Sequence, residues 1–391
     1  MFSLDNFYNI IHSNLIGPIG GQSNYFTPFG TYQHHMVLDR TFQITDITEQ
    51  FQIKNSWNVP NLTTGFHHCY FFDQEPFYTN TRDIALNSIL TWEQFSGPEH
   101  VKILANSEHS ELISKFAKDK GFYNWYYFFH GIAALDWYRD FQYVPQSYFN
   151  RYDKVFICYN HIISKLRSYR LHLVSNLIEQ NLVQHGHVSL QLQDHVHTWQ
   201  EVIKDPEAML SGQARLHINR IMSTVTEPLV IDTVEPHGSL SAEVNLDQLT
   251  SALWHVVTET VYFLPKLHLT EKIFKPIVAR RPFMLVGAPG NLAYLKSYGF
   301  KTFDQWIDES YDQEQDHYIR IEKITAEIAR LCAMPADDLK QMHQDMQTVL
   351  EHNFQHFYGS FKSIIVNELV DNFQPLVPDR DLTDVKLRLL N

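Results

Sequence analysis

The sequence predicts an α/β protein with two Rossmann-like domains, because short apolar runs that suit buried strands alternate with stretches of helical composition. Five apolar runs stop abruptly at polar or glycine residues, as the carboxyl ends of parallel strands do: 68–72, 101–105, 125–129, 253–257 and 283–286. Two stretches between the first three runs have the length of crossover helices: 83–95 and 111–120. At 391 residues the chain is long enough for two domains, each with its own core.

Three segments are expected along the chain: 1–150, 151–355 and 356–391. The second segment begins with a strand at 154–158 and a helix at 169–182, whose leucines share one side, and a short strand follows at 187–192. Helical spacing then runs from 321 to 331 and, beyond Pro335, from 339 to 349. A last helical segment is expected at 354–373.

Composition predicts a globular protein, since 44% of the residues are hydrophobic and 19% are charged. Acidic residues exceed basic ones by 44 − 31 = 13, so the molecule as a whole repels nucleic acid and anionic lipid. Two basic patches depart from that average: Lys266, Lys272, Lys275, Arg280 and Arg281, and Lys154, Lys165, Arg167 and Arg170.

A cytoplasmic location is expected for three reasons. The three cysteines, Cys69, Cys158 and Cys332, cannot all pair and suit reduced thiols. No apolar run approaches the roughly 20 residues of a membrane span. The N-terminus has no basic region before its first apolar residues and carries Asp5, which argues against a secretory signal.

The stretch 254–290 carries the strongest chemical pattern. Glu259 follows a buried strand, at the position where open α/β sheets bind ligands. Thr270 suits the N-cap of a helix whose first turn carries Glu271 and Lys272. Pro276 marks a kink or a second helix start. Because unpaired backbone N–H groups and the helix dipole attract anions, such a helix start beside a lysine suits a phosphate.

The order Glu259-Thr260, a gap, then Thr270-Glu271-Lys272 resembles the donor-binding segment of α1,3-fucosyltransferases and related two-domain glycosyltransferases, where a Glu-Asn pair precedes a Thr-Glu-Lys triplet. The resemblance implies a GT-B fold, in which two Rossmann-like domains face each other across a cleft. It also implies that the helical segment at 354–373 packs back across the domain junction. It implies that Glu259 and Glu271 meet the ribose or sugar hydroxyls of the donor and that Lys272 meets its diphosphate. Thr260 in place of Asn is a departure that leaves the donor sugar open.

A second part of the resemblance lies at the start of the 151–355 domain. Those enzymes carry a strand, a Ser-Asn pair, an arginine and a helix there, and Asn160 and Arg170 occupy the matching positions, with Tyr159 in place of Ser. Arg170 is expected to contact the diphosphate, and Arg167 competes for that role. Lys275 belongs to the same basic stretch as Lys272 and is counted with the donor-binding residues.

A carboxylate side chain in the N-terminal domain is expected to take the proton of the acceptor hydroxyl, since sugar transfer with inversion requires a general base. Asp73 and Glu75 directly follow an apolar run and are the leading candidates, with Glu108 in reserve. The same residues also suit an ordinary turn before Pro76.

The aromatic run 122–129 suits a buried strand better than a stacking platform for sugars or bases. The 22 histidines include pairs such as His185 and His187, but no carboxylate or cysteine completes a ligand set, so no metal site is expected.

The expected function is a metal-independent, inverting glycosyltransferase that uses a GDP- or UDP-linked sugar as co-substrate and needs no other cofactor. Residues 1–150 would hold the acceptor. The acceptor would be either a glycan or a hydroxymethylated base in DNA, which is the kind of base that phage enzymes of this sort modify. Residues 151–355 would hold the donor. The alternative is a catalytically inactive protein of the same fold that binds a nucleotide or a glycan. The oligomeric state stays open.

Overall fold

The computed structural model describes residues 4–19, 21–27, 43–47, 53–55, 67–77, 102–145, 152–194, 197–231 and 245–391. The predicted helix at 83–95 lies outside these residues. The chain divides into two compact units: Met1–Asp136 with Ser360–Asn391, and Trp137–Gly359. The first division falls after residue 136 and not after 150. On the second-unit side of it, the Tyr138 carbonyl accepts a hydrogen bond from the Tyr358 hydroxyl at 2.7 Å.

The first unit contains a six-stranded sheet in the order β3-β2-β1-β4-β5-β6, parallel except where β2 meets β3. Its strands are β1 (Gly21–Thr27), β2 (Gln43–Ile47), β3 (Ile53–Asn55), β4 (His67–Phe72), β5 (Lys102–Asn106) and β6 (Phe122–Tyr126). The chain winds outward from β1 in one direction and from β4 in the other. The boundary between β1 and β4 is therefore a topological switch point, and open α/β sheets bind ligands at the carboxyl ends of strands at such points.

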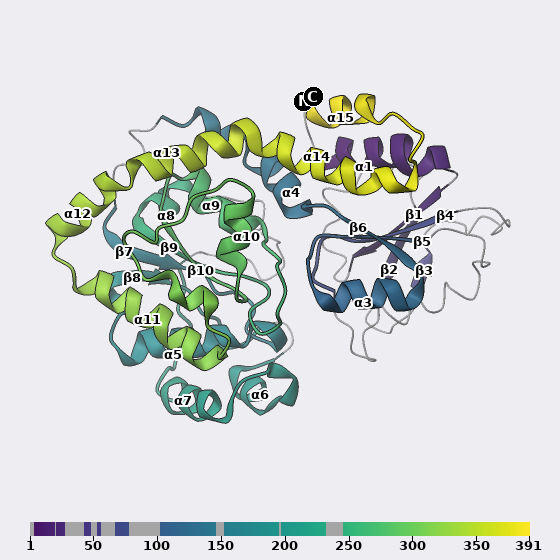
Figure 1. Ribbon diagram of the computed structural model, residues 1–391. Coiled ribbons are helices and arrows are strands. Elements are labelled where there is room, and N and C mark those ends of the chain that lie inside the picture. The colour runs from purple at the N-terminus through teal and green to yellow at the C-terminus, as the bar shows by residue number, and fades with distance from the viewer. Residues whose placement is uncertain are drawn as a thin grey trace. The chain divides into compact units, whose positions relative to one another are not determined.

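Helices cover both faces of this sheet. They are α1 (Leu4–Ile11), α3 (Glu111–Lys120), α4 (Phe129–Trp137), α14 (Lys362–Phe373) and α15 (Thr383–Leu390). Figure 1 shows α3 on one face and α1, α14 and α15 on the other. Local sequence sets the bounds of α3: the Ser110 hydroxyl caps its first turn, and Gly121, at a φ of 68°, ends it in a left-handed conformation.

The aromatic run 122–129 lies in the core of the first unit, as predicted. Trp125 is fully buried, its indole N–H donates to the Leu369 carbonyl at 3.0 Å, and its ring packs edge-on against Phe373. The predicted strand at 125–129 was misplaced. The strand is Phe122–Tyr126, and Phe129 already begins α4, because an uninterrupted aromatic run has no periodicity that marks the change.

The second unit contains a four-stranded sheet in the order β10-β9-β7-β8, and all its strands are parallel. They are β7 (Lys154–Cys158), β8 (Gly186–Val188), β9 (Ala252–Thr258) and β10 (Phe283–Val286). These strands confirm the four predicted in this part of the chain, although β8 is shorter than expected. Winding from β7 to β8 and from β9 to β10 runs in opposite directions, so the switch point lies between β7 and β9.

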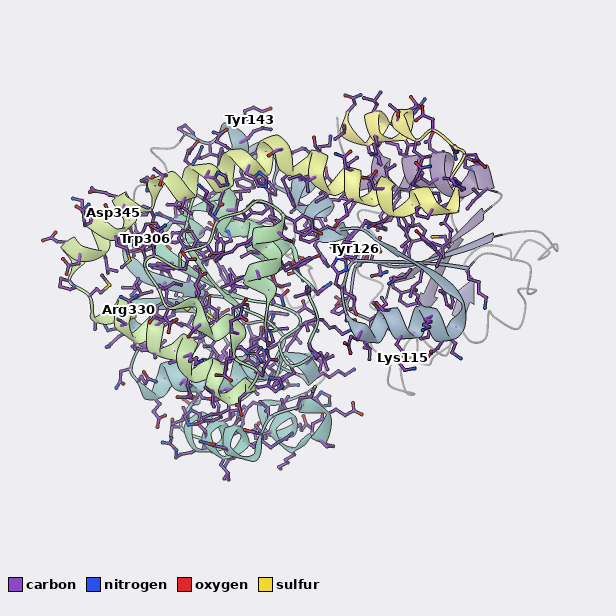
Figure 2. All side chains as sticks on the ribbon, in the orientation of Figure 1. Lys115, Tyr126, Tyr143, Trp306, Arg330 and Asp345 are labelled. Carbon is purple, nitrogen blue, oxygen red and sulfur yellow. The ribbon has the colours of Figure 1, made fainter. Side chains whose placement is uncertain are left out.

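The helices of the second unit are α5 (Tyr169–Glu179), α6 (Trp199–Lys204), α7 (Gly212–Met222), α8 (Leu246–Thr250), α9 (Phe274–Val278), α10 (Asn291–Ser297), α11 (His317–Ala333), α12 (Ala336–Asp345) and α13 (Gln347–His356). Figure 1 shows α5 and α11 on one side of the sheet and α8 and α9 on the other. Pro335 separates α11 from α12, as predicted. Side chains fill the space between the sheet and its helices in each unit (Figure 2).

The two units together form an α/β protein with mainly parallel sheets, which confirms the predicted fold class at that level. Cys69, Cys158 and Cys332 are free thiols, as expected. Within the described ranges, no helix combines the length and apolar character needed to cross a bilayer.

Candidate functional site

The two halves of the sequence motif meet at the carboxyl end of β9. Glu259 is 1% exposed, and its backbone N–H donates to the Val286 carbonyl at 3.0 Å, which extends the pairing of β9 with β10. Its carboxylate accepts two hydrogen bonds from Thr270, one from the backbone N–H at 3.2 Å and one from the hydroxyl at 2.6 Å. This contact closes the loop between the two residues.

Thr270 in turn caps the short 3₁₀ helix Glu271–Ile273, and α9 follows it. The Lys272 ammonium lies 3.0 Å from the Thr270 hydroxyl and 3.4 Å from both the Thr260 hydroxyl and the Glu271 carboxylate. The Lys272 side chain is 32% exposed, whereas that of Glu271 is 4% exposed. Lys272 therefore brings a cation to the surface of an otherwise buried polar cluster.

Arg170 is buried and joins the two strands that flank the switch point, β7 and β9, by hydrogen bonds beyond or at their carboxyl ends. Its Nη1 donates to the Ile162 carbonyl, beyond β7, at 2.9 Å, and its Nη2 donates to the Thr258 carbonyl, at the end of β9, at 3.0 Å. It is 4% exposed. Arg170, which was expected to bind the diphosphate, thus has two of its nitrogens bound to backbone carbonyls of the protein itself.

Asn160 links the ends of β7 and β8. Its side-chain amide donates to the Ser189 carbonyl at 3.1 Å and to the Cys158 sulfur at 3.2 Å, and its backbone N–H donates to the Ser189 hydroxyl at 2.9 Å. Burial raises the pKa of the Cys158 thiol to about 11. Arg167 and Lys275 are both half-buried, in the 3₁₀ helix Lys165–Arg167 and in α9 respectively.

In the first unit, Asp73 lies directly after β4, beside the switch point between β1 and β4. It is 2% exposed, and its Oδ2 accepts hydrogen bonds from two hydroxyls, that of Tyr8 at 2.8 Å and that of Tyr127. Burial raises the pKa of Asp73 to about 6, although the two tyrosine hydroxyls act in the opposite direction. Its titration therefore falls close to neutral pH.

Asp73 begins a turn that runs from residue 73 to residue 77, and Glu108 anchors the other end of this turn. Its Oε2 accepts the Phe77 backbone N–H at 2.8 Å, and its Oε1 accepts the Ser110 hydroxyl at 2.7 Å. Glu75 lies between the two anchored ends of the 73–77 turn and is half-buried, in contrast to Asp73 and Glu108, which are each 2% exposed. Of the three base candidates, Glu75 is the one that is not fully buried.

The structure thus brings together Glu259, Thr270, Glu271 and Lys272 in one unit, and Asp73, Glu75 and Glu108 in the other. Sequence reasoning missed four residues that build these edges: Tyr8, Tyr127, Tyr169 and Arg320. The Tyr169 hydroxyl donates to the Glu259 carbonyl at 2.6 Å, and Arg320 donates to the Tyr262 and Gly287 carbonyls at 2.9 and 2.8 Å. Their partners lie tens of residues away, so no local motif marks them.

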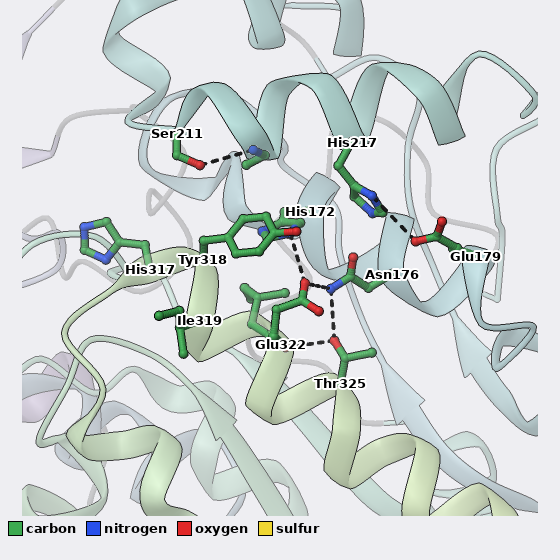
Figure 3. Close-up of polar contacts among 12 residues, drawn as sticks. His172, Asn176, Glu179, Ser211, His217, His317, Tyr318, Ile319, Glu322 and Thr325 are labelled. Atoms are coloured by element: carbon green, nitrogen blue, oxygen red, sulfur yellow. Dashed lines mark hydrogen bonds and ion pairs between the residues drawn. The ribbon is translucent and has the colours of Figure 1, made fainter.

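A separate polar cluster joins α5 to α11. Figure 3 shows Glu322 beside His172 and Asn176. The Asn176 amide donates to the Glu322 carboxylate at 2.7 Å, His172 Nε2 lies 3.6 Å from the same oxygen, and the Tyr318 ring stacks on His172 with centroids 4.7 Å apart. In the described part of the chain, no three His, Cys, Asp or Glu side chains are arranged to hold a metal ion.

A cavity of about 630 Å³ lies at the opposite edge of the second sheet, where Asp153, Gly186 and Ser251 mark the amino ends of strands. Its lining reaches Ile231 and Asn245, which border residues outside the described ranges. The polar clusters described above lie instead at the carboxyl ends of strands, each in its own unit: the Glu259 cluster after β9 and the Asp73 cluster after β4. Comparison with protein-family models, with curated proteins and with solved structures finds no match to this chain.

Proposed function

We propose that this protein is a glycosyltransferase of the GT-B type, which moves a sugar from a nucleotide diphosphate to an acceptor hydroxyl. One observation carries the proposal: the Glu259–Thr270 contact joins two motif halves that are separate in sequence and leaves the Lys272 ammonium partly exposed at a carboxyl sheet edge. Carboxyl edges at switch points are where α/β proteins bind nucleotides.

In this proposal the second unit binds the donor. Lys272 contacts the diphosphate, and Glu271 beside it accepts hydrogen bonds from donor hydroxyls. Glu259 and Arg170 serve the site by holding the Thr270 segment and the strand ends, because the Glu259 carboxylate and both Nη atoms of Arg170 already bind other parts of the chain. A cation fixed at the departing diphosphate stabilises the charge that develops in the transition state.

The first unit supplies the base, and Glu75 is the residue we assign to it. The acceptor oxygen attacks the anomeric carbon as the bond from that carbon to the diphosphate oxygen breaks, and the hydroxyl proton passes to the Glu75 carboxylate. General-base assistance of this kind contributes roughly 10² to 10⁴ in rate. The acceptor class is a glycan or a hydroxymethylated base in DNA.

The donor claim is tested by thermal unfolding in the presence of GDP-, UDP- and CDP-sugars, since a ligand that binds the native state raises its stability. At least one donor should raise the melting temperature of the wild type and release free nucleotide diphosphate when an acceptor is added. Lys272→Ala should lose both effects. Lys340→Ala, on the exposed side of α12, is the matched control and should keep them. Absence of stabilisation by every donor would contradict the proposal.

One observation favours a binding protein without transferase activity: the carboxylates of Asp73 and Glu108 already accept hydrogen bonds from the chain. Such a protein would be stabilised by a nucleotide sugar in a Lys272-dependent way and would release no diphosphate. The same panel therefore separates the two functions.

A further inference from the structure

We propose that Asp73 is a positioning residue that holds Glu75 for proton transfer and that Tyr8 and Tyr127 fix Asp73 in that role. This inference rests on the proposed transferase function, in which Glu75 is the base. Two buried tyrosines from distant parts of the chain thereby gain a role in positioning the base.

The first step is the convergence of two elements on one oxygen. Tyr8 comes from α1 and Tyr127 directly follows β6, and both hydroxyls donate to Oδ2 of Asp73. The Gln74 amide also lies 3.4 Å from the Tyr8 hydroxyl. Tyr8 and Tyr127 are 3% and 0% exposed, so neither hydroxyl has water as an alternative partner. The start of the 73–77 turn is therefore tied to two elements at once.

The other end of the turn is anchored as well. Glu108 binds the Phe77 N–H, and Pro76 restricts the backbone of the preceding residue, which is Glu75, to extended conformations. A five-residue turn with both ends anchored and a proline inside it has little freedom. A fixed geometry of this kind is what a general base needs in order to meet a hydroxyl within hydrogen-bond reach.

The charge on Asp73 affects the strength of the hydrogen bonds that it accepts. Among the described residues, the titratable groups that face it are Tyr8 from α1, Cys69 from β4, Tyr127 after β6 and His130 from α4. Tyr127 remains a donor at neutral pH, because burial raises the pKa of its hydroxyl far above the ordinary value. Protonation of Asp73, whose pKa is about 6, replaces its charged hydrogen bonds to the two tyrosines with weaker neutral ones, while it removes the cost of burying the charge.

The test compares four variants in sugar transfer, each with a pH profile and separate kcat and KM values. Glu75→Gln should lose at least about 100-fold in kcat. Asp73→Ala and Tyr127→Phe should lower kcat with little change in the KM for the donor. Asp73→Asn keeps an acceptor oxygen for both hydroxyls, so it should retain more activity than Asp73→Ala and lose any inflection of the wild-type profile near pH 6.

A loss in Asp73→Asn as large as that in Glu75→Gln would make Asp73 the base itself and would overturn the proposal, as would wild-type kcat in Asp73→Ala. Amide hydrogen exchange at Phe77 gives a readout that needs no activity: exchange should speed up in Asp73→Ala and in Tyr127→Phe. If the wild type transfers no sugar, the proposed function fails, and unchanged exchange in both variants would separately refute the hold on the turn. Tyr127→Phe covers the case in which Asp73→Ala fails to fold.

Discussion

Glu259 and Thr270 are joined by two hydrogen bonds, from the Thr270 N–H and from its hydroxyl to the two oxygens of one buried carboxylate. The pair spans eleven positions of sequence and closes the loop that follows β9. Because Thr270 also caps the 3₁₀ helix that carries Lys272, the position of that ammonium depends on a carboxylate at the end of a strand.

Glu259→Gln should lower the free energy of unfolding by about 1 to 3 kcal/mol, because an amide N–H would face one of the Thr270 donors and leave it unsatisfied. The variant should also lose stabilisation by the nucleotide sugar. Urea unfolding and the donor panel measure the two effects. Asn176→Ala, in the cluster of Figure 3, is a control that removes a partly buried hydrogen bond elsewhere in the same unit. It should destabilise the protein and leave the stabilisation by the donor intact.

Arg170→Lys should destabilise the second unit by about 1 to 3 kcal/mol although it keeps the charge, since a single ammonium cannot reproduce the fork that reaches the Ile162 and Thr258 carbonyls. Denaturant unfolding monitored by tryptophan fluorescence checks this. Arg167→Lys, at a half-buried position, should change the stability by less than about 0.5 kcal/mol. Equal effects at the two positions would contradict the bracing role of Arg170.

Acid should destabilise the second unit through two buried histidines. Burial lowers the pKa of His255 to about 3 and that of His343 to about 4, from an ordinary value of 6.5. Between pH 6.5 and 4 the unfolded chain therefore binds more protons than the folded one, and stability falls as the pH falls. Each histidine contributes up to about 1.4 kcal/mol per pH unit in that window. Asp73, whose folded pKa is raised, acts in the opposite sense below pH 6. Unfolding free energies measured between pH 7 and 4 for the wild type and for His343→Leu isolate the histidine contribution, and the variant should show the smaller loss of stability as the pH falls.

Asp73→Asn should stabilise the first unit at pH 8, in contrast to its expected cost in activity. The folded pKa of Asp73, about 6, lies above the ordinary value of 3.8, so the wild type loses stability as the pH rises through 6. Removal of the charge should recover up to about 3 kcal/mol at pH 8 and little at pH 4. Melting temperatures of the two proteins at both pH values give the comparison. A gap that stayed constant with pH would show that Asp73 does not titrate in this range.

Several elements could be predicted because the signals that define them are local. The strands β7 and β10 match their predicted bounds, since each is an apolar run that stops at a polar residue or a glycine. The helix α3 begins at a serine cap and ends at a glycine, and Thr270 caps the helical turn that follows it. Caps and periodicity depend on residues within a few positions, so one sequence carries them in full.

The tertiary structure alone decided which polar groups meet. Arg170 donates to two backbone carbonyls, one of them 88 residues away at Thr258, and no local pattern marks either partner. Tyr8 and Asp73, 65 residues apart, share no motif, and yet their hydrogen bond anchors the turn that carries Glu75. A buried donor or acceptor must find a partner wherever the folded chain provides one. The sequence by itself therefore determined the strands, the caps and the candidate acids, and the fold decided which of them hold the framework and which reach the surface.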